Sequence, residues 1–207
     1  MNNPVVCVFA KMWDCGPVKT RLAADIGEQK ARTVYRQVAE QVWSQLESTE
    51  FQRWLWMVDN DVCNKAGKWL HGADKVLPQV DGNLGQRIHH AMKIALDSGA
   101  RWCAVVGTDA PAVNSKMLQE AETLLFKKEA PDIVLTPAYD GGYAMIAGRI
   151  TAKELFTEIE WSTPRVLAQT LERIEKLNLT GHLLQKVHDL DTLEDLRKLE
   201  KSKIFPT

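Results

Sequence analysis

Residues 5–21 read VVCVFAKMWDCGPVKTR, an apolar run that passes directly into a polar loop containing one glycine. The run from Val5 to Ala10 is rich in β-branched residues and hardly alternates polar with apolar, which is typical of a strand buried on both faces. Similar short runs recur along the chain. They predict further strands at 54–58, 102–106, 133–135 and 183–187.

Amphipathic helical patterns separate these runs, most clearly at 28–47, where apolar residues recur at steps of three and four. Two more cover 84–96 and the residues after Asn114-Ser115. Another begins near 162–164, with Ser162 or Thr163 expected as cap and Pro164 in the first turn. The alternation predicts an α/β fold, a three-layer α/β/α sandwich around a mainly parallel, mixed sheet. No linker or repeat divides the chain, so one domain over 1–207 is expected.

The overall composition excludes several classes of protein. The chain of 207 residues has 26 Lys plus Arg against 27 Asp plus Glu, and this balance argues against nucleic-acid binding. No basic leader or apolar run of membrane-spanning length is present in the sequence, so we expect a cytoplasmic protein. The four cysteines are widely spaced without a C-x-x-C pair, which favours neither a zinc site nor a disulfide framework.

The loop after the first strand, residues 11–21, is here called the basic loop. Ligands of parallel sheets bind at the carboxyl ends of the strands, and this loop carries three cations suited to a diphosphate, Lys11, Lys19 and Arg21. It is not a Walker loop, because Val18 replaces the glycine before the lysine. The alternative is that these cations only solvate a helix start. Arg87, at another helix entry, is a further phosphate contact or a solvated arginine.

A carboxylate follows the strand predicted at 102–106, in the sequence Gly107-Thr108-Asp109-Ala110-Pro111. Asp109 occupies a position suited to a metal-phosphate site, and its alternative role is to cap the next turn. Near the C-terminus, Asp191 stands three residues before Glu194 and fits a capping box for a final helix. Asp189 has no such structural role.

If Asp109 and Asp189 converge to about 4 Å, they repel by roughly 4 kcal/mol at an effective dielectric near 20. A divalent cation between them would relieve the repulsion. Mg²⁺ binds one or two carboxylates and takes its remaining ligands from substrate phosphates and water, which fits so few acidic ligands. Such a metal would arrive largely with its nucleotide.

Two further segments carry polar chemistry. Asp140-Gly141-Gly142 follows a strand, where the glycines would let a ligand touch the backbone and Asp140 would bind an acceptor hydroxyl. Its alternative is a plain hairpin turn. Trp161 could stack on a ligand or be buried. The stretch 51–56, with Trp43 and Trp69 nearby, could form a homodimer surface, although core packing is favoured.

Taken in order, six motifs resemble the bacterial DUF2064 family. Its members are described as candidate glycosyltransferases in the GT-A-fold nucleotide-diphospho-sugar transferase superfamily, which also holds nucleotidylyltransferases. The resemblance covers about residues 5 to 197. The motifs are Val18-Lys19-Thr20-Arg21-Leu22, Gly82-Asn83-Leu84-Gly85-Gln86-Arg87, Gly107-Thr108-Asp109-Ala110-Pro111, Asp140-Gly141-Gly142-Tyr143, Trp161-Ser162-Thr163-Pro164-Arg165 and Asp189-Leu190-Asp191-Thr192.

The resemblance implies a Rossmann-like GT-A fold and a nucleotide held by Lys19 and Arg21. It implies Mg²⁺ or Mn²⁺ at Asp109, with Asp189 and Asp191 as the second acidic position, and it places Asp140-Gly141-Gly142 at the acceptor. The basic loop departs from relatives, which tend to be proline-rich at 13–16, and Ala110 stands where they commonly have cysteine. Asp14 would then bring a negative charge to the phosphate side.

These observations predict a metal-dependent transferase that joins a nucleotide-activated donor to a small-molecule acceptor. Glycosyl transfer is the first hypothesis, with Asp109 and Asp140 as the catalytic residues. The second is a nucleotidylyltransferase that joins a nucleoside triphosphate to a phosphorylated small molecule. The third is a protein that binds a nucleotide or partner without catalysis.

Overall fold

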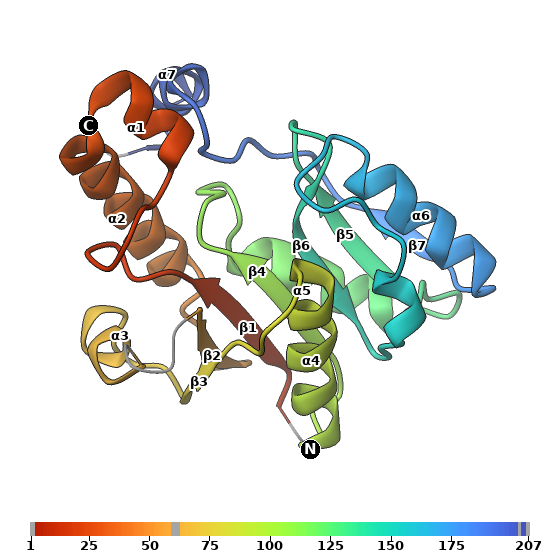
Figure 1. Ribbon diagram of the computed structural model, residues 1–207. Coiled ribbons are helices and arrows are strands. Elements are labelled where there is room, and N and C mark those ends of the chain that lie inside the picture. The colour runs from red at the N-terminus through yellow and green to blue at the C-terminus, as the bar shows by residue number, and fades with distance from the viewer. Residues whose placement is uncertain (1–2, 59–62, 203, 206–207) are drawn as a thin grey trace.

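The computed structural model describes residues 3–58, 63–202 and 204–205 (Figure 1). Seven strands form one sheet, with the order β3-β2-β1-β4-β6-β5-β7. Their bounds are β1 (Val5–Ala10), β2 (Gln52–Met57), β3 (Lys75–Pro78), β4 (Cys103–Gly107), β5 (Ile133–Pro137), β6 (Tyr143–Gly148) and β7 (Gly181–Leu183). The helices are α1 (Thr20–Ile26), α2 (Glu28–Gln45), α3 (Cys63–Trp69), α4 (Leu84–Asp97), α5 (Ser115–Leu125), the 3-10 helix η2 (Lys153–Phe156), α6 (Val166–Lys176) and α7 (Leu193–Lys201).

The sheet is mixed and mainly parallel, as the sequence predicts. β6 alone among the described strands runs antiparallel, and it pairs with β4 on one side and β5 on the other. The glycines of 141–142 turn the chain from β5 into β6, so this segment is a hairpin turn, and its predicted contact with a ligand stays a prediction. β6 itself was not expected, because its sequence YAMIAG contains alanines and a glycine, which have low strand propensity.

Two helical layers cover the sheet because alternate side chains of its strands point to opposite faces. Val6 and Val8 of β1 pack with α1, α2, α3, α5 and α7. Val5 and Cys7 of the same strand pack with α4, η2 and α6. The three-layer sandwich is therefore confirmed, and the carboxyl ends of β1 and β4 lie side by side at one edge (Figure 1).

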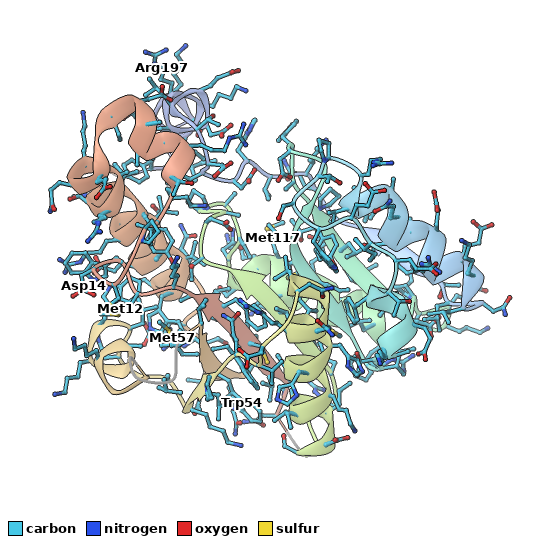
Figure 2. The ribbon with its side chains drawn as sticks, in the orientation of Figure 1. Met12, Asp14, Trp54, Met57, Met117 and Arg197 are labelled. Atoms are coloured by element: carbon cyan, nitrogen blue, oxygen red, sulfur yellow. The ribbon has the colours of Figure 1, made fainter. Side chains whose placement is uncertain are left out.

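The tryptophans of the central region belong to this core, as the core-packing interpretation predicts. Trp43, Trp54 and Trp56 are at most 5% exposed. Figure 2 shows Trp54 and Met57 within the body of the molecule. The Arg53 guanidinium lies 4.4 Å from the centre of the Trp43 ring, which accommodates a buried cation in the same layer.

Two predicted helix caps are wrong by a few residues. α6 is capped by Arg165 without a side-chain hydrogen bond, because the Thr163 hydroxyl donates to the Glu160 carbonyl instead and Pro164 lies outside the helix. α7 has its capping box at Thr192 and Asp195 rather than at Asp191 and Glu194. Within the described residues, no helix has both the length and the apolar character needed to cross a membrane.

Candidate functional site

A cleft of about 870 Å³ opens at the carboxyl ends of the central strands. Every predicted site residue except Gly141 lines it, from the basic loop, α4, the end of β4, the β5–β6 turn, the segment 161–166 and the entry to α7. A second cavity of about 450 Å³ beside α4 and η2 contains none of the predicted residues. The tertiary structure therefore gathers residues that the sequence places up to 180 positions apart, namely Lys11, Lys19, Arg21, Arg87, Asp109, Asp140, Gly142, Trp161, Asp189 and Asp191.

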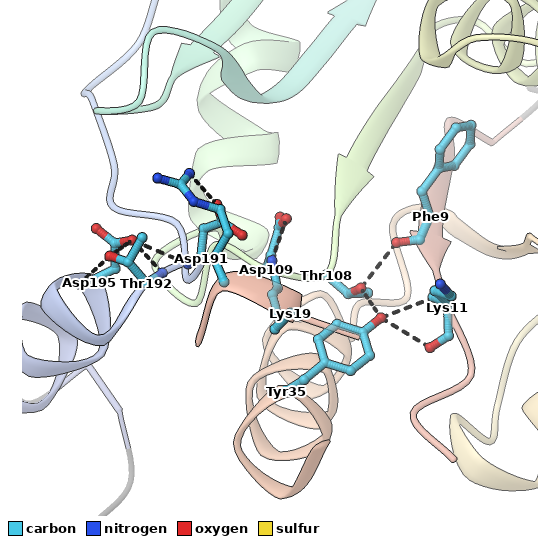
Figure 3. A network of polar contacts seen from close by, with 10 residues as sticks. Phe9, Lys11, Lys19, Tyr35, Thr108, Asp109, Asp191, Thr192 and Asp195 are labelled. Atoms are coloured by element: carbon cyan, nitrogen blue, oxygen red, sulfur yellow. Dashed lines mark hydrogen bonds and ion pairs between the residues drawn. The ribbon is translucent and has the colours of Figure 1, made fainter. Parts of the chain in front are cut away.

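Lys19 of the basic loop forms an ion pair with Asp109, which follows the end of β4 (Figure 3). Its Nζ lies 3.1 Å from Asp109 Oδ2, and the lysine side chain is only 12% exposed. Burial alone would lower the pKa of Lys19, but the charge of Asp109 and its hydrogen bond raise that pKa above the ordinary value. Lys19 caps α1 with φ 45° and ψ 54°, a left-handed backbone that is costly for a residue other than glycine and is often found at functional sites.

Arg21 and Asp191 form a second pair beside the first. The Arg21 guanidinium lies 2.7 Å from Asp191 Oδ2, and the arginine side chain is 72% exposed. Because Thr192 caps α7, Asp191 is available for this contact. Two of the four cations predicted to bind phosphate thus pair with two of the three carboxylates predicted to bind metal.

Asp189 completes the acidic side of the cleft. The backbone NH of the next residue, Leu190, donates to the Asp109 carbonyl at 2.8 Å and joins the two acidic segments. Burial, together with the negative charges of Asp109 and Asp140, raises the pKa of Asp189 to about 6. Asp189 therefore lies close enough to Asp109 and to Asp140 for both charges to act on it.

Lys11 and Arg87 donate to backbone carbonyls, whereas Asp14 lies outside the cleft. Lys11 Nζ donates to the Pro17 carbonyl at 2.7 Å and so closes the basic loop on itself. Arg87 Nε donates to the Gly82 carbonyl at 3.1 Å in front of α4. Asp14 is exposed at the outer edge of the basic loop (Figure 2) and does not line the cleft, so the expectation that its charge faces the phosphate is wrong.

Packing explains the glycine at position 141 of the β5–β6 turn. Gly141 has φ 95°, and a Cβ there would lie 2.2 Å from the Pro164 carbonyl oxygen. Its own carbonyl accepts from the Leu167 NH at 2.9 Å, which joins the turn to α6. Asp140 Oδ1 accepts from the Gly142 NH at 2.8 Å. The structure therefore places Gly141 against the chain itself, outside the lining of the cleft, whereas Asp140 and Gly142 line it.

Trp161 is half-buried in the wall of the cleft. A Cβ on Gly85 would lie 2.5 Å from the Trp161 ring, so the start of α4 approaches the indole closely. The ring of Tyr143 meets that of Trp161 edge to face, with their centroids 6.5 Å apart. The indole therefore packs against the protein and also lines the cleft, and its stacking on a ligand stays a prediction.

Tyr35 and Thr108 are site residues that the sequence did not reveal (Figure 3). Tyr35 Oη lies 3.0 Å from the Lys11 nitrogen, 3.1 Å from the Lys11 oxygen and 3.2 Å from Thr108 Oγ1. Thr108 donates in turn to the Phe9 carbonyl at 3.1 Å. This network ties the start of the basic loop to the residue preceding Asp109. The only sequence signal is a tyrosine on an apolar helix face, whose hydroxyl must find a partner when buried.

The donor set at the acidic side fits a divalent cation that its substrate helps to bind. Among the described residues, no group of three or more His, Cys, Asp or Glu side chains is close enough to bind a metal by itself. Asp109 and Asp189 are oxygen donors that repel each other, and this is the chemistry that Mg²⁺ or Mn²⁺ stabilises when phosphate oxygens and water complete the shell.

A family model described as "Uncharacterized protein conserved in bacteria (DUF2064)" matches residues 41–163. The chain belongs to the DUF2064 family. The matched region contains Arg87, Asp109, Asp140 and Trp161, whereas the basic loop and the acidic segment at 189–191 lie outside it. In this DUF2064 protein the first ion pair joins Lys19, outside the matched region, to Asp109 inside it. Both members of the second pair, Arg21 and Asp191, lie outside the matched region.

Solved structures extend the comparison over nearly the whole chain. A protein from Desulfovibrio desulfuricans G20, described as a candidate nucleotide-diphospho-sugar transferase, has 29% identity and a TM-score of 0.90 over 98% of this chain and 88% of that one. CMP:2-keto-3-deoxy-manno-octonic acid synthetase complexed with CTP has 12% identity and a TM-score of 0.61, covering 98% and 100%.

Glucosyl-3-phosphoglycerate synthase from Mycobacterium tuberculosis, in complex with Mn²⁺ and UDP, has 10% identity and a TM-score of 0.55, covering 98% and 77%. This structure and the CTP complex share the fold with the DUF2064 protein. No protein with a curated description matches it in sequence.

Proposed function

We propose that this DUF2064 protein is a metal-dependent transferase that moves a sugar from a nucleotide-diphospho-sugar to a small-molecule acceptor. The observation that carries the proposal is the double ion pair of Lys19 with Asp109 and Arg21 with Asp191 at the carboxyl end of a parallel sheet. It combines cations for a diphosphate with carboxylates for a metal in one cleft. The description of the Desulfovibrio desulfuricans protein supports the same class of reaction.

The cations would bind the diphosphate of the donor. Lys19 is a buried, charged amine and Arg21 an exposed guanidinium, so the first supplies a fixed positive charge and the second a bidentate contact. Lys11 and Arg87 line the same cleft and would add weaker contacts. Since Lys19 and Arg21 already have carboxylate partners, a bound diphosphate would compete with those carboxylates for the two cations.

The displaced carboxylates would hold the divalent cation. Asp109 and Asp189 are the proposed ligands, and Asp191 is the third candidate. Mg²⁺ or Mn²⁺ bound there would stabilise negative charge on the leaving diphosphate. This assignment couples the binding of the metal to the binding of the diphosphate, because Asp109 would bind the metal when Lys19 binds the diphosphate. We therefore expect each ligand to bind more tightly when the other is present.

Asp140 is the proposed partner of the acceptor hydroxyl. Its Oδ1 is held by the Gly142 NH, whereas Oδ2 accepts no hydrogen bond from any residue that the structure describes. A carboxylate fixed by one oxygen can orient a hydroxyl with the other and accept its proton. Trp161 and Gly142 line the cleft beside it and are the proposed acceptor contacts.

Two other functions use the same cleft. A nucleotidylyltransferase would cleave a nucleoside triphosphate and release pyrophosphate, and its fold relative with bound CTP favours testing it. The products separate the reactions: nucleoside diphosphate released from a sugar nucleotide supports glycosyl transfer, whereas pyrophosphate released from a triphosphate supports the rival. The third possibility is binding without catalysis.

A thermal-shift panel tests the proposal. It uses uridine, guanosine, adenosine, cytidine and thymidine nucleotides and their sugar conjugates, with and without Mg²⁺ or Mn²⁺. A ligand at a hundred times its Kd adds about 2.7 kcal/mol, and for a chain of this size each kcal/mol raises the Tm by roughly 2–4 °C. We expect one base to stand out and its shift to need metal. No shift across the panel would refute a nucleotide-dependent transferase.

A further inference from the structure

The charged residues that line the cleft come from particular segments of the chain. The lining cations among the described residues come from the basic loop and from α4. Two other lining segments, 138–146 and 161–166, are here called the acceptor segments. Every residue of both segments is described, and the side chains that line the cleft from them include no cation.

The lining residues of the acceptor segments suit an uncharged ligand. Their single charged side chain is Asp140, and the others are small, aromatic, aliphatic or hydroxyl-bearing. Ser162 and Thr163 provide hydroxyl groups, and the rings of Tyr143 and Trp161 provide apolar surface. This mixture of acid, hydroxyl and aromatic surface matches a molecule with several hydroxyl groups and a carbon face.

Arg165, which lies within the second segment, and Lys186 both have partners outside the cleft. Arg165 forms an ion pair with the Glu160 carboxylate. Lys186 Nζ lies 4.8 Å from the centre of the exposed Tyr139 ring. Neither cation lines the cleft, and neither does Tyr139. A phosphate beside Asp140 would therefore meet the carboxylate of Asp140 and that of Asp189, since the charge of Asp140 acts on Asp189.

We infer that the acceptor of this DUF2064 protein is a hydroxyl compound, neutral or carrying an amine, that has no phosphate or carboxylate group. The inference rests on the proposed function and narrows its substrate class. It opposes the kind of product named for the Mycobacterium tuberculosis relative, which carries a phosphoglycerate.

The transfer itself is consistent with such an acceptor. A hydroxyl oxygen forms a bond to the anomeric carbon of the donor sugar while the bond from that carbon to the diphosphate oxygen breaks. The nucleoside diphosphate leaves with the electron pair, and the hydroxyl proton passes to Asp140 and then to water. An acceptor that carries its own anion would lie against this carboxylate and oppose its ionised form.

Ligand-observed NMR on the full chain tests the inference with matched pairs of compounds. The pairs are glucose and glucose 6-phosphate, glycerol and glycerol 3-phosphate, and glucosamine and glucosamine 6-phosphate. Mg²⁺ and pyrophosphate are added to saturation first, so that a phosphate ester cannot occupy the diphosphate site. We expect at least one parent compound to bind at least tenfold more tightly than its phosphate ester.

Charge variants locate the preference within the cleft. Asp140→Lys should reverse the preference in favour of the phosphate ester, and Asp140→Asn, which retains an oxygen for the Gly142 NH, should bring the two affinities within about threefold. Glu172→Lys is the matched control, since Glu172 is exposed on α6 and does not line the cleft. It should leave the preference unchanged.

The outcomes separate the inference from the proposed function. If Mg²⁺ and pyrophosphate do not bind, the diphosphate site is wrong and the inference falls with it. If they bind but the phosphate esters are preferred, or no compound binds, the inference alone is wrong. An equal response of Glu172→Lys and Asp140→Lys would also overturn it, because the effect would then come from net charge.

Discussion

The two walls of the cleft are held together in different ways. The basic loop is joined to the acidic side by ion pairs between side chains, Lys19 with Asp109 and Arg21 with Asp191. The acceptor segments are joined by backbone, with Gly141 packed against Pro164 and its carbonyl bonded to the Leu167 NH. A side-chain pair can exchange its partner for a ligand charge, whereas a backbone contact cannot. We therefore expect the first wall to respond to ligands and the second to stay fixed.

The largest effect should come from breaking the fixed wall. Gly141→Ala places a Cβ 2.2 Å from the Pro164 carbonyl at a residue with φ 95°, so the free energy of unfolding should fall by about 3–5 kcal/mol. Gly16→Ala is the control in the basic loop, where φ is 73° and nothing lies within 4 Å of the new Cβ. It should cost only about 1 kcal/mol. Urea unfolding measures both, and equal losses would contradict the difference between the walls.

Removal of the buried ion pair should come next. Asp109→Ala leaves the Lys19 ammonium, 12% exposed, without its carboxylate, and the free energy of unfolding should fall by about 2–3 kcal/mol. The same change should abolish the effect of Mg²⁺ on pyrophosphate affinity, measured by calorimetry. Asp97→Ala removes an exposed partner of Lys93 and should cost less than about 1 kcal/mol. Metal-dependent binding that survives in Asp109→Ala would exclude Asp109 as a ligand.

The hydroxyl network of the first wall should have a smaller effect. Tyr35→Phe removes the partner of the Lys11 NH and carbonyl, and about 1–2 kcal/mol should be lost as these polar groups lose their hydrogen bonds. Hydrogen exchange at the Lys11 amide should become faster. Thr33→Val removes an exposed hydroxyl from the same helix and should change stability by less than about 0.5 kcal/mol. Unchanged exchange at Lys11 would show that Tyr35 does not fix the loop.

The exposed pair should matter least for stability and still matter for binding. Arg21→Ala should change the free energy of unfolding by less than about 0.5 kcal/mol, because the Arg21 side chain is 72% exposed. Affinity for Mg²⁺-pyrophosphate should fall about tenfold at low salt, and the loss should shrink as salt increases. Arg32→Ala, on α2 and outside the cleft lining, is the control. Equal binding losses in the two variants would show that Arg21 acts only through net charge.

Much of the fold could be predicted because it depends on local pattern. The run from Val5 to Ala10 became β1 over the same residues, and the helical pattern from Leu84 ends within one residue of α4. β3 and β6 were missed because one is short and half-exposed and the other contains weak strand formers. The caps near Ser162 and Asp191 were misplaced, since several residues there can serve as a cap and only packing chooses among them.

The residues of the candidate site could be predicted from the sequence, but most of the contacts between them could not. Strand ends identified Lys19 and Asp109, because polar residues after buried strands gather at one edge of a sheet. Their pairing with each other could not be predicted, since 90 residues separate them in the chain. The role of Tyr35 was hidden in the apolar face of a helix, where its ring and its hydroxyl serve different partners.

The sequence by itself determined the layers of this protein, the ends of its main strands and the polar residues that follow them, because these depend on periodicity and on neighbours along the chain. Only the tertiary structure decided that Lys19 meets Asp109, that Arg21 meets Asp191 and that Gly141 packs under Pro164. Contacts of this kind depend on distances across the sheet. They decide which charges meet a ligand together with a partner of opposite charge, as Lys19 and Arg21 would.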